Sequence, residues 1–266
     1  MRLHVGARTD VGRVRDLNED AYRASTDRCL FVVCDGMGGA PAGEVASDMA
    51  VQAIVQHFNN ATFDRGAVEE PGNGYMRQTS RLADAIRRCN QILYANSQQD
   101  PCRSGMGTTV VAVCIAKHVA SIAHVGDSRA YLWHDGSLEP LTRDHSLVDA
   151  QLRAGVLRPD SPAVSEQQHI LLRVLGRVPD VDVELTEVPV QPGDYLLLCS
   201  DGVTRMMSDP AIAEAIAQHR EPQRIADRLI DAANERGGAD NATVVVIEIR
   251  KQWWARLSLQ WKRKGM

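Results

Sequence analysis

Apolar residues occur in short runs along this chain, and two of the runs end in an acidic residue followed by glycine. The run 31–34 leads into Asp35-Gly36 and a glycine-rich turn, and the run 196–200 leads into Asp201-Gly202. Runs of this length predict buried strands, and a carboxylate at the end of such a strand is held rigidly at a polar rim. Glycine beside the acid lets the backbone approach a bound cation without a side chain in the way.

The first half of the chain changes from strand patterns to helix patterns after the glycine-rich turn. Apolar residues at helical spacing between Val45 and Phe58 predict an amphipathic helix, and a second helical pattern follows a polar loop. The expected elements are strands over 3–7, 21–25 and 31–35, a helix from the glycines to about 58, a loop over 59–74 and a helix over 76–97.

The second half returns to strands that are joined by short links. Because a parallel connection needs a long crossover, strands this close in sequence must pair antiparallel. Asp135-Gly136 between two apolar stretches predicts a tight hairpin. The expected elements are strands over 108–116, 119–125, 130–133, 170–175, 182–190 and 194–200, a short helix and a flap within 146–168, helices over 209–218 and 222–236, and a last strand over 242–249.

Grouped strands flanked by paired helices predict an α+β fold, with two packed antiparallel sheets and helices on their outer faces. The chain has 266 residues, 44% hydrophobic and 24% charged, so a single large domain can bury a full core. The net charge of −4 gives no reason to expect nucleic acid as a partner. Residues 251–266 carry five basic residues and no acid, so we expect an acidic catalytic domain over 1–250 and a basic tail over 251–266.

The cysteines and the N-terminus indicate the compartment. The six cysteines form no CxxC pair and lie mostly in apolar runs, which favours reduced, buried thiols. The first residues lack the apolar core of a signal peptide, and no stretch approaches the length of a membrane span. We therefore expect a cytoplasmic protein, and we take it to be a monomer.

The basic tail predicts a helix with Trp254, Leu257 and Trp261 on one face and most of the basic residues elsewhere. Such a helix suits an anionic lipid surface or an acidic partner. A disordered basic end, or a tail whose tryptophans dock on the chain's own domain, fits the same pattern equally well.

Three carboxylates stand beside apolar runs, namely Asp35, Asp201 and Asp240. Since no histidine or cysteine cluster has ligand spacing, these hard oxygen ligands favour magnesium or manganese over zinc. Two such ions can share a carboxylate and convert a bridging water into a nucleophile for phosphorus. Arg15 is the candidate to bind the phosphate opposite the metals, because its planar guanidinium can grip two oxygens.

Each of these residues alone has a simpler explanation. A single Asp-Gly after an apolar run is usually a turn, and we interpret Asp135-Gly136 in this way. An isolated Asp20 or Asp127 more often caps a helix or a turn, and an isolated Arg15 is more often a surface residue. The metal-site interpretation depends on the whole set occurring together.

Short motifs connect these residues along nearly the whole chain. They are Arg15-Asp16-Leu17-Asn18-Glu19-Asp20, Asp35-Gly36-Met37-Gly38-Gly39, Gly43-Glu44-Val45-Ala46-Ser47, Gly107-Thr108-Thr109, Val125-Gly126-Asp127-Ser128-Arg129, Leu141-Thr142-Arg143-Asp144-His145-Ser146, Ser200-Asp201-Gly202 and Asp240-Asn241-Ala242-Thr243. Together and in this order, they resemble the motifs of the type 2C (PPM) metal-dependent protein serine/threonine phosphatases, over about residues 6–249. Each motif alone is weak, and the combination is specific.

The resemblance implies an α-β-β-α sandwich with a binuclear manganese or magnesium centre in a cleft at one end of the sheets. Arg15 matches the family's phosphate-gripping arginine, and the segment 146–168 matches a flap that influences substrate access. The implied ligands are Asp35 for both metals, the Gly36 carbonyl for one of them, Asp201 and Asp240 for the other, Glu19 and Asp20 for the first metal mostly through water, and Asp127 with Asp201 for a third, weaker metal.

The chain departs from the family pattern at one position. Animal members commonly carry a histidine after the Asp-Gly, proposed as the acid that protonates the leaving alkoxide, whereas this chain has Met37, as many bacterial relatives do. A thioether cannot donate a proton, so water or another group must do so. His145 is one substitute, and a conventional turn or hydrogen-bonding role for it is the alternative.

The expected activity is hydrolysis of phosphoserine and phosphothreonine in proteins, opposing a bacterial serine/threonine kinase. A cysteine-based phosphatase is an alternative, because 199–205 fits C-x-x-G-x-x-R, although Asp201 would repel phosphate from that loop. A second alternative is a catalytically inactive phosphatase-fold domain that only binds partners. A third is a domain that metal merely stabilises, which leaves Arg15 unexplained.

Overall fold

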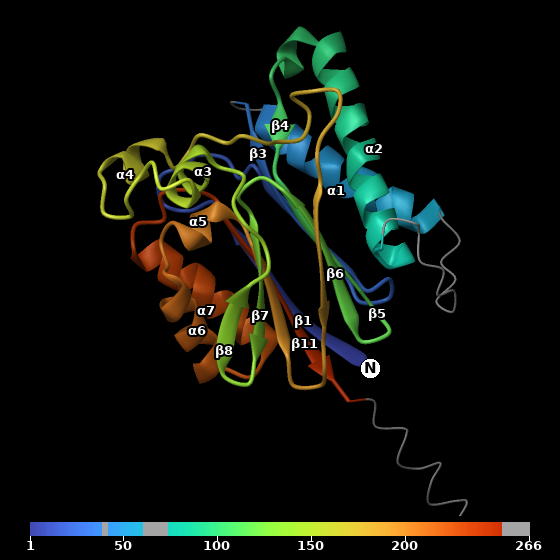
Figure 1. Ribbon diagram of the computed structural model, residues 1–266, viewed down its shortest axis with the longest axis vertical. Helices are drawn as coiled ribbons and strands as arrows, with labels where there is room; N and C mark the ends of the chain where they lie inside the picture. Colours follow the sequence, from blue (N-terminus) through green and yellow to red (C-terminus); the bar gives the residue numbers. More distant parts are fainter. Residues whose placement is uncertain (39–41, 61–73, 252–266) are drawn as a thin grey trace, which may run out of the picture.

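The computed structural model describes residues 1–38, 42–60 and 74–251, which fold into four layers (Figure 1). The predicted tail helix lies outside the described residues. The strands are β1 (Arg2–Asp10), β2 (Asp20–Ser25), β3 (Leu30–Met37), β4 (Gly107–Thr108), β5 (Val110–Ala116), β6 (Val119–Val125), β7 (Arg129–His134), β8 (Ser137–Pro140), β9 (Glu184–Pro189), β10 (Tyr195–Cys199) and β11 (Ala242–Arg250). The helices are α1 (Ala42–Asn60), α2 (Arg77–Gln99), α3 (Leu147–Arg153), α4 (Ala163–Gln167), α5 (Asp201–Thr204), α6 (Asp209–Gln218) and α7 (Pro222–Glu235), with a 3-10 turn η1 (Pro101–Arg103).

The strands form two sheets in which the pairs are antiparallel. One sheet has the order β1-β11-β10-β7-β8, and the other has the order β2-β3-β5-β6-β9, with β4 paired to β3. The first and last strands are neighbours over their whole length, with Asp10 opposite Ala242 and Arg2 opposite Arg250. The N-terminal and C-terminal segments of the chain therefore meet in one sheet, and both lead to the same end of the sandwich.

The apolar layers follow from the two-residue period of the strands. In β3, Leu30 and Val32 pack beneath α1 and α2, whereas Phe31 and Val33 face the other sheet and form part of the layer between the sheets. Helices α6 and α7 cover the outer face of the sheet that contains β10 and β11 (Figure 1). The predicted arrangement of two antiparallel sheets with helices outside is confirmed.

The hairpin predicted at Asp135-Gly136 is confirmed, with φ angles of 47° and 82° at these two residues. The strand predicted over 170–175 is wrong. Leu171 and Leu175 form only isolated bridges, to Ser146 and Thr108 respectively, and because these partners belong to different segments no continuous ladder can form.

The predicted flap segment contains α3 and α4, connected by irregular chain. Two short elements, η1 and α5, have no counterpart among the predicted elements because each is less than two turns long. Among the described residues, no helix has both the length and the apolar composition required to cross a membrane.

Candidate metal and phosphate site

Polar side chains replace apolar ones at one end of the layer between the sheets. In β3, Phe31 and Val33 face this layer, and the same alternation brings Asp35 into it two residues later. On β5, β10 and β11, the buried residues Val111, Leu198 and Val245 also belong to this layer. The residues two positions from them, toward the same end of the sandwich, are Thr109, Ser200 and Thr243.

Asp20 is the first residue of β2 and lies directly opposite Asp35. Its Oδ2 accepts hydrogen bonds from the hydroxyls of Ser200 and Thr243, each 2.7 Å long. Its Oδ1 is buried and has no hydrogen-bond partner among the described residues. Because a buried carboxylate oxygen without a partner is costly, this atom points to a ligand that completes the site.

Asn241 fastens the segment 11–19 to the beginning of β11. Its side-chain amide donates to two backbone carbonyls of this segment, at 2.9 and 2.8 Å, and its Oδ1 accepts from the Glu19 N–H at 2.8 Å. Arg15, in the same segment, lies with a guanidinium nitrogen 2.9 Å from Oδ2 of Asp240. The predicted residues Arg15, Glu19 and Asp240 are therefore brought together by a side chain to which the sequence reasoning gave no role.

Two glycines allow the elements of the site to pack closely. A Cβ on Gly36 would lie 2.1 Å from the carbonyl oxygen of Gly43, and one on Gly202 would lie 2.0 Å from the carbonyl oxygen of Asn241. No larger residue fits at either position, because real side chains do not approach backbone so closely. The second contact fixes the start of α5, and with it Asp201, against the residues that precede β11.

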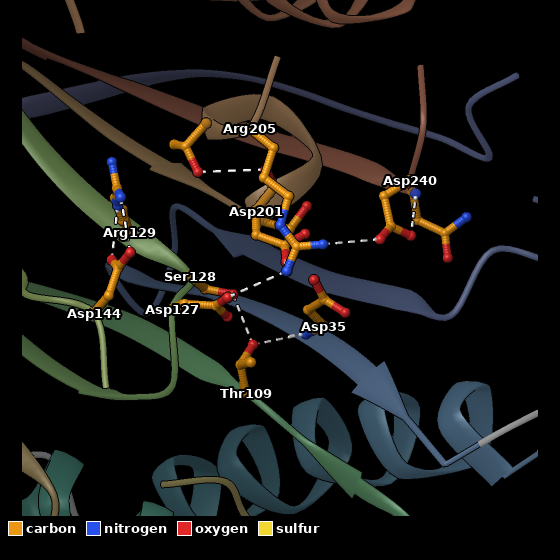
Figure 2. Close-up of polar contacts among 12 residues, drawn as sticks. Asp35, Thr109, Asp127, Ser128, Arg129, Asp144, Asp201, Arg205 and Asp240 are labelled. Carbon is orange, nitrogen blue, oxygen red and sulfur yellow. Dashed lines mark hydrogen bonds and ion pairs between the residues drawn. The ribbon is translucent and has the colours of Figure 1, made fainter. Parts of the chain in front are cut away.

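Asp127 lies in the turn between β6 and β7, which a second network holds in place. Thr109 Oγ1 is 2.7 Å from Ser128 Oγ and accepts a hydrogen bond from the Asp35 N–H at 3.1 Å, as Figure 2 shows. Gly126 precedes Asp127 with a φ of 111°, a conformation that favours glycine. The turn is thereby tied to β3, the strand that carries Asp35.

Arg205, one residue beyond α5, lies among the carboxylates (Figure 2). Its guanidinium forms ion pairs with Asp201, with Asp127 at 3.7 Å and with Asp240 at 3.4 Å. In the sequence, this arginine is notable only as the last residue of the cysteine-phosphatase pattern over 199–205. Its spacing of four residues from Asp201, about one helical turn, was the available signal.

The acids that converge here, which we call the acid cluster, are Asp20, Asp35, Asp127, Asp201 and Asp240. Burial raises the pKa of Asp35 well above its ordinary value, and the charges of the other four acids raise it further. Burial also raises the pKa of Asp20 to about 7, although its two hydroxyl partners oppose this. Burial raises the pKa of Asp127 and Asp201 as well, against the opposing charge of Arg205. The cluster therefore carries more negative charge than Arg15 and Arg205 balance.

A cleft of about 580 Å³ opens beside the acid cluster, and every member except Asp20 lines it. Arg15, Glu19 and Arg205 line it as well, and Met37 and His169 complete another part of the wall. His145 is not among the described residues that line the cleft. The histidine that lines it among the described residues is His169, which follows α4 and lies between the predicted flap over 146–168 and the predicted strand over 170–175.

The residues fit a hard divalent cation. Besides Oδ1 of Asp20, Oδ1 of Asp201 is buried and has no hydrogen-bond partner among the described residues, and all the donors offered are oxygens. Oxygen donors of this kind are those preferred by magnesium and manganese. A cation at this position would reverse the effect of the mutual repulsion, because it favours the ionised form of each carboxylate.

A second polar cluster, the histidine cluster, consists of His124, His145 and Glu184, whose potential ligand atoms lie within 4.8 Å of one another. His145 Nδ1 accepts a hydrogen bond from the Gly126 N–H at 3.2 Å, so Nε2 carries the proton and donates to Glu184 Oε2 at 3.1 Å. His124 Nε2 donates to the Arg143 carbonyl at 2.8 Å and stacks on His145 with a centroid distance of 4.5 Å. Because both nitrogens of His145 are engaged, this cluster is a hydrogen-bonded support and not a metal site.

The cysteine-based alternative conflicts with the environment of Cys199. This residue is fully buried at the end of β10, and burial raises the pKa of its thiol to about 12. A nucleophilic cysteine requires a thiolate that forms near neutral pH and is accessible to substrate. Cys199 meets neither condition.

Comparison with known proteins identifies relatives of the whole described fold. The family model of protein phosphatase 2C matches residues 12–237. The serine/threonine phosphatase stp of Listeria welshimeri is similar in sequence, with 39% identity over 249 residues that cover 92% of this chain and 96% of the relative. None of these similarities favours an inactive binding domain.

The solved structures similar to this chain include serine/threonine phosphatases as well. The serine/threonine phosphatase PstP/Ppp of Mycobacterium tuberculosis superposes with a TM-score of 0.83 at 35% identity, covering 94% of this chain and 100% of that chain. The catalytic domain of the serine/threonine protein phosphatase PstP, solved in complex with two manganese ions, superposes with a TM-score of 0.80 at 36% identity, covering 94% and 99% of the two chains.

Proposed function

Because this chain belongs to the protein phosphatase 2C family and is a metal-dependent serine/threonine phosphatase, we propose specific roles for its own residues in that reaction. The observation that supports the proposal best is the convergence of five acids from distant parts of the chain, three of which are buried and two of which have a buried oxygen without a partner among the described residues. Such a cluster needs cations to be stable at neutral pH.

The acids hold two manganese or magnesium ions. In the proposed arrangement Asp35 serves both ions, the Gly36 carbonyl and, mostly through water, Glu19 and Asp20 serve the first, Asp201 and Asp240 serve the second, and Asp127 with Asp201 serves a third, weaker ion. Divalent ions bound there supply charge that neutralises phosphate oxygens and lowers the pKa of a water that attacks phosphorus directly, without a phosphoenzyme.

Arg15 binds the phosphate of the substrate. It lines the cleft, is half exposed and uses one nitrogen on Asp240, so further N–H groups remain to donate to phosphate oxygens. Asn241 positions Arg15 and Glu19 through its bonds to their segment. The guanidinium thus lies in the wall of the cleft beside Asp240, where it can contact a bound phosphate.

His169 donates the proton that the leaving serine or threonine alkoxide requires. Met37 has no proton to give, and His169 is the histidine that lines the cleft within the described residues. A side chain at the wall of the cleft can reach the leaving group directly or through one water. We assign the transfer to its imidazole N–H.

The physiological setting follows from this chemistry. A protein phosphatase consumes the product of a kinase, so the matching enzyme is a serine/threonine kinase that phosphorylates the same proteins. We place both in the cytoplasm, which the lack of disulfides among the described residues supports, and we expect residues 1–250 to act as a monomeric catalytic domain. The basic tail over 251–266 remains our candidate for contact with an anionic surface or an acidic partner.

The decisive experiment compares substrates and variants in saturating manganese and in chelator. We expect hydrolysis of a phosphothreonine peptide with manganese and none in chelator, and Arg15→Ala should raise KM about tenfold with a smaller change in kcat, since one bidentate contact is lost. Arg13→Ala, an exposed arginine of the same segment, is the matched control. Equal hydrolysis in chelator and in manganese would refute the metal mechanism.

The role of His169 has its own test. The aryloxide of an aryl phosphate can leave without being protonated, whereas the alkoxide of an alkyl phosphate needs a proton. His169→Gln should lower kcat for the phosphothreonine peptide about 10²-fold and leave p-nitrophenyl phosphate turnover nearly unchanged. Equal losses with both substrates would remove His169 as the proton donor.

A further inference from the structure

Arg205 is the cation that the acid cluster already contains. Its side chain is 24% exposed, and its guanidinium lies within ion-pair distance of three carboxylates, those of Asp201, Asp127 and Asp240 (Figure 2). The backbone fixes its starting point, because the Arg205 N–H donates to the Asp201 carbonyl at 2.8 Å. One positive charge is thus divided among three negative groups.

Arg129, which Figure 2 also shows, illustrates what a matched arginine pair looks like in the same region. Its Nε and one terminal nitrogen donate to the two oxygens of Asp144 at 2.7 and 2.8 Å, in a bidentate pair. Arg205 has no such geometry with Asp127 or Asp240, whose oxygens lie 3.7 and 3.4 Å away. Its contacts with these two acids are therefore more easily exchanged for another cation.

We propose that Arg205 is an internal counter-cation that competes with a divalent ion for Asp127 and Asp201. While no ion is bound at this pair, the guanidinium balances part of its negative charge, and an ion can bind there only after the guanidinium withdraws. The affinity for the weakest ion is then set by this arginine as well as by the ligands. The inference rests on the proposed assignment of Asp127 and Asp201 as ligands.

The charge balance supports exchange of the Arg205 guanidinium for a divalent cation. Arg15 and Arg205 are the arginines that contact the acid cluster, and Arg15 contacts only Asp240 among the described residues. Removal of Arg205 would leave Asp127 and Asp201 with no cationic partner in the described part of the chain. A divalent cation brings twice the charge of the guanidinium and meets oxygen lone pairs directly, so it can replace this contact.

The experiment titrates metal-free protein with Mn²⁺ and follows binding by calorimetry and by the electron paramagnetic resonance signal of free Mn²⁺. Arg205→Gln, which keeps a polar side chain and removes the charge, should bind the weakest Mn²⁺ about ten times more tightly or better, because the competing cation is gone. Arg87→Gln removes the same charge from α2, where Arg87 pairs with Asp84 at 3.1 Å, and should leave the affinity unchanged. Equal affinity in wild type and Arg205→Gln would overturn the proposal.

Further variants separate this inference from the ligand assignment. Asp127→Asn should remove the weakest Mn²⁺ site, and Arg205→Gln should give no gain in the Asp127→Asn background. If Asp127→Asn leaves the number of bound ions unchanged, the ligand assignment itself fails. If Asp127→Asn removes the site and Arg205→Gln still changes nothing, only the counter-cation role fails.

Thermal unfolding supplies a readout that does not depend on turnover. In chelator, Arg205→Gln should melt at a lower temperature than wild type, and Mn²⁺ should raise its melting temperature more than it raises that of wild type. A variant that folds only with Mn²⁺ would also support the role. Arg205→Lys, which retains a single point charge, should bind the weakest ion with intermediate affinity, and identical affinities in the Arg, Lys and Gln proteins would contradict it.

Discussion

The acid cluster and the histidine cluster are two groups of buried and partly buried potential ligands that meet at the Gly126-Asp127 turn. In the histidine cluster, the ring nitrogens of His145 are both engaged, by the Gly126 N–H and by Glu184. In the acid cluster, one oxygen of Asp20 and one of Asp201 have no partner among the described residues. The two clusters therefore differ in whether their polar atoms have hydrogen-bond partners, and not in whether potential ligands lie close together.

This difference supports the acid cluster as the proposed metal site. By distance alone the histidine cluster is a candidate metal site, because its potential ligand atoms lie within 4.8 Å of one another. Its hydrogen bonds exclude that interpretation. The acid cluster is the better candidate. It has buried oxygens without hydrogen-bond partners among the described residues, and burial and the neighbouring acids raise the pKa of Asp35. A cluster whose polar atoms all have hydrogen-bond partners fixes the positions of its side chains. A cluster that has buried polar atoms without partners is suited to bind a ligand.

The strongest test of the comparison removes one charge from each cluster. Asp35→Asn, Asp201→Asn and Asp240→Asn should each lower turnover about 10³-fold or more, because the ions that neutralise the transition state would be lost or displaced. In chelator their melting temperatures should equal or exceed that of wild type, since like-charge repulsion decreases. Glu184→Gln is the control from the histidine cluster, and full activity in any of the three Asn variants would contradict the assignment.

Metal should stabilise the folded chain through the acid cluster. An ion at 100 times its Kd contributes about 2.7 kcal/mol to the free energy of unfolding, which corresponds to a rise of about 5 to 10 °C in melting temperature for a chain of this size. Glu184→Gln should show the full rise on addition of manganese, and Asp35→Asn should show little of it. An equal rise in both variants would place the ions elsewhere.

The histidine cluster should matter for stability more than for chemistry. His145→Gln removes the acceptor of the Gly126 N–H and should lower the free energy of unfolding by about 1 to 3 kcal/mol, with a loss of kcat/KM of less than about tenfold. Its pH–rate profile should keep the shape of the wild-type profile. A lost limb of that profile would instead make His145 a participant in proton transfer.

The smallest effect is on pH dependence. Burial lowers the pKa of His145, against its bond to Glu184, so this residue binds protons more readily in the unfolded chain than in the folded one. Its contribution to stability is complete above its unfolded pKa of about 6.5 and is lost as pH falls through the lower folded value. Between pH 7.5 and 5 in chelator, wild type should therefore lose more stability than His145→Gln. The raised pKa values of the acids act in the opposite direction in both proteins, so the difference between them reports His145 together with Glu184, whose pKa is lowered, against the effect of burial, by its bond to this histidine.

Much of the site could be predicted from the sequence because its acids are adjacent to long apolar runs. Asp35 continues the alternation of Phe31 and Val33, and Asp201 follows β10, so strand periodicity alone places both at the end of the sandwich. Asp20 could be placed only through the family resemblance, since a single polar residue before a short strand carries no such signal. Its position opposite Asp35 depends on the register of two strands.

The residues that support the site could not be predicted, because their partners lie far away in sequence. Asn241 binds a segment more than 200 positions earlier, and Ser200 and Thr243 meet on Asp20 only when both sheets are packed. The wrong strand over 170–175 has the same origin. Leu171 and Leu175 have strand-like neighbours in sequence, but the packed structure gives them partners in two different segments.

The pairing of the first and last strands also sets where this enzyme can be tethered. The last described residue, Lys251, follows Arg250, which lies opposite Arg2 at the far end of β11 from Asp240. The eight steps along β11 from Ala242 to Arg250, at roughly 3.3 Å each, put about 26 Å between that exit point and the end of the strand beside Asp240. An anchor or fusion partner attached beyond residue 251 would therefore hold the enzyme by its base and leave the catalytic opening directed away from the attachment.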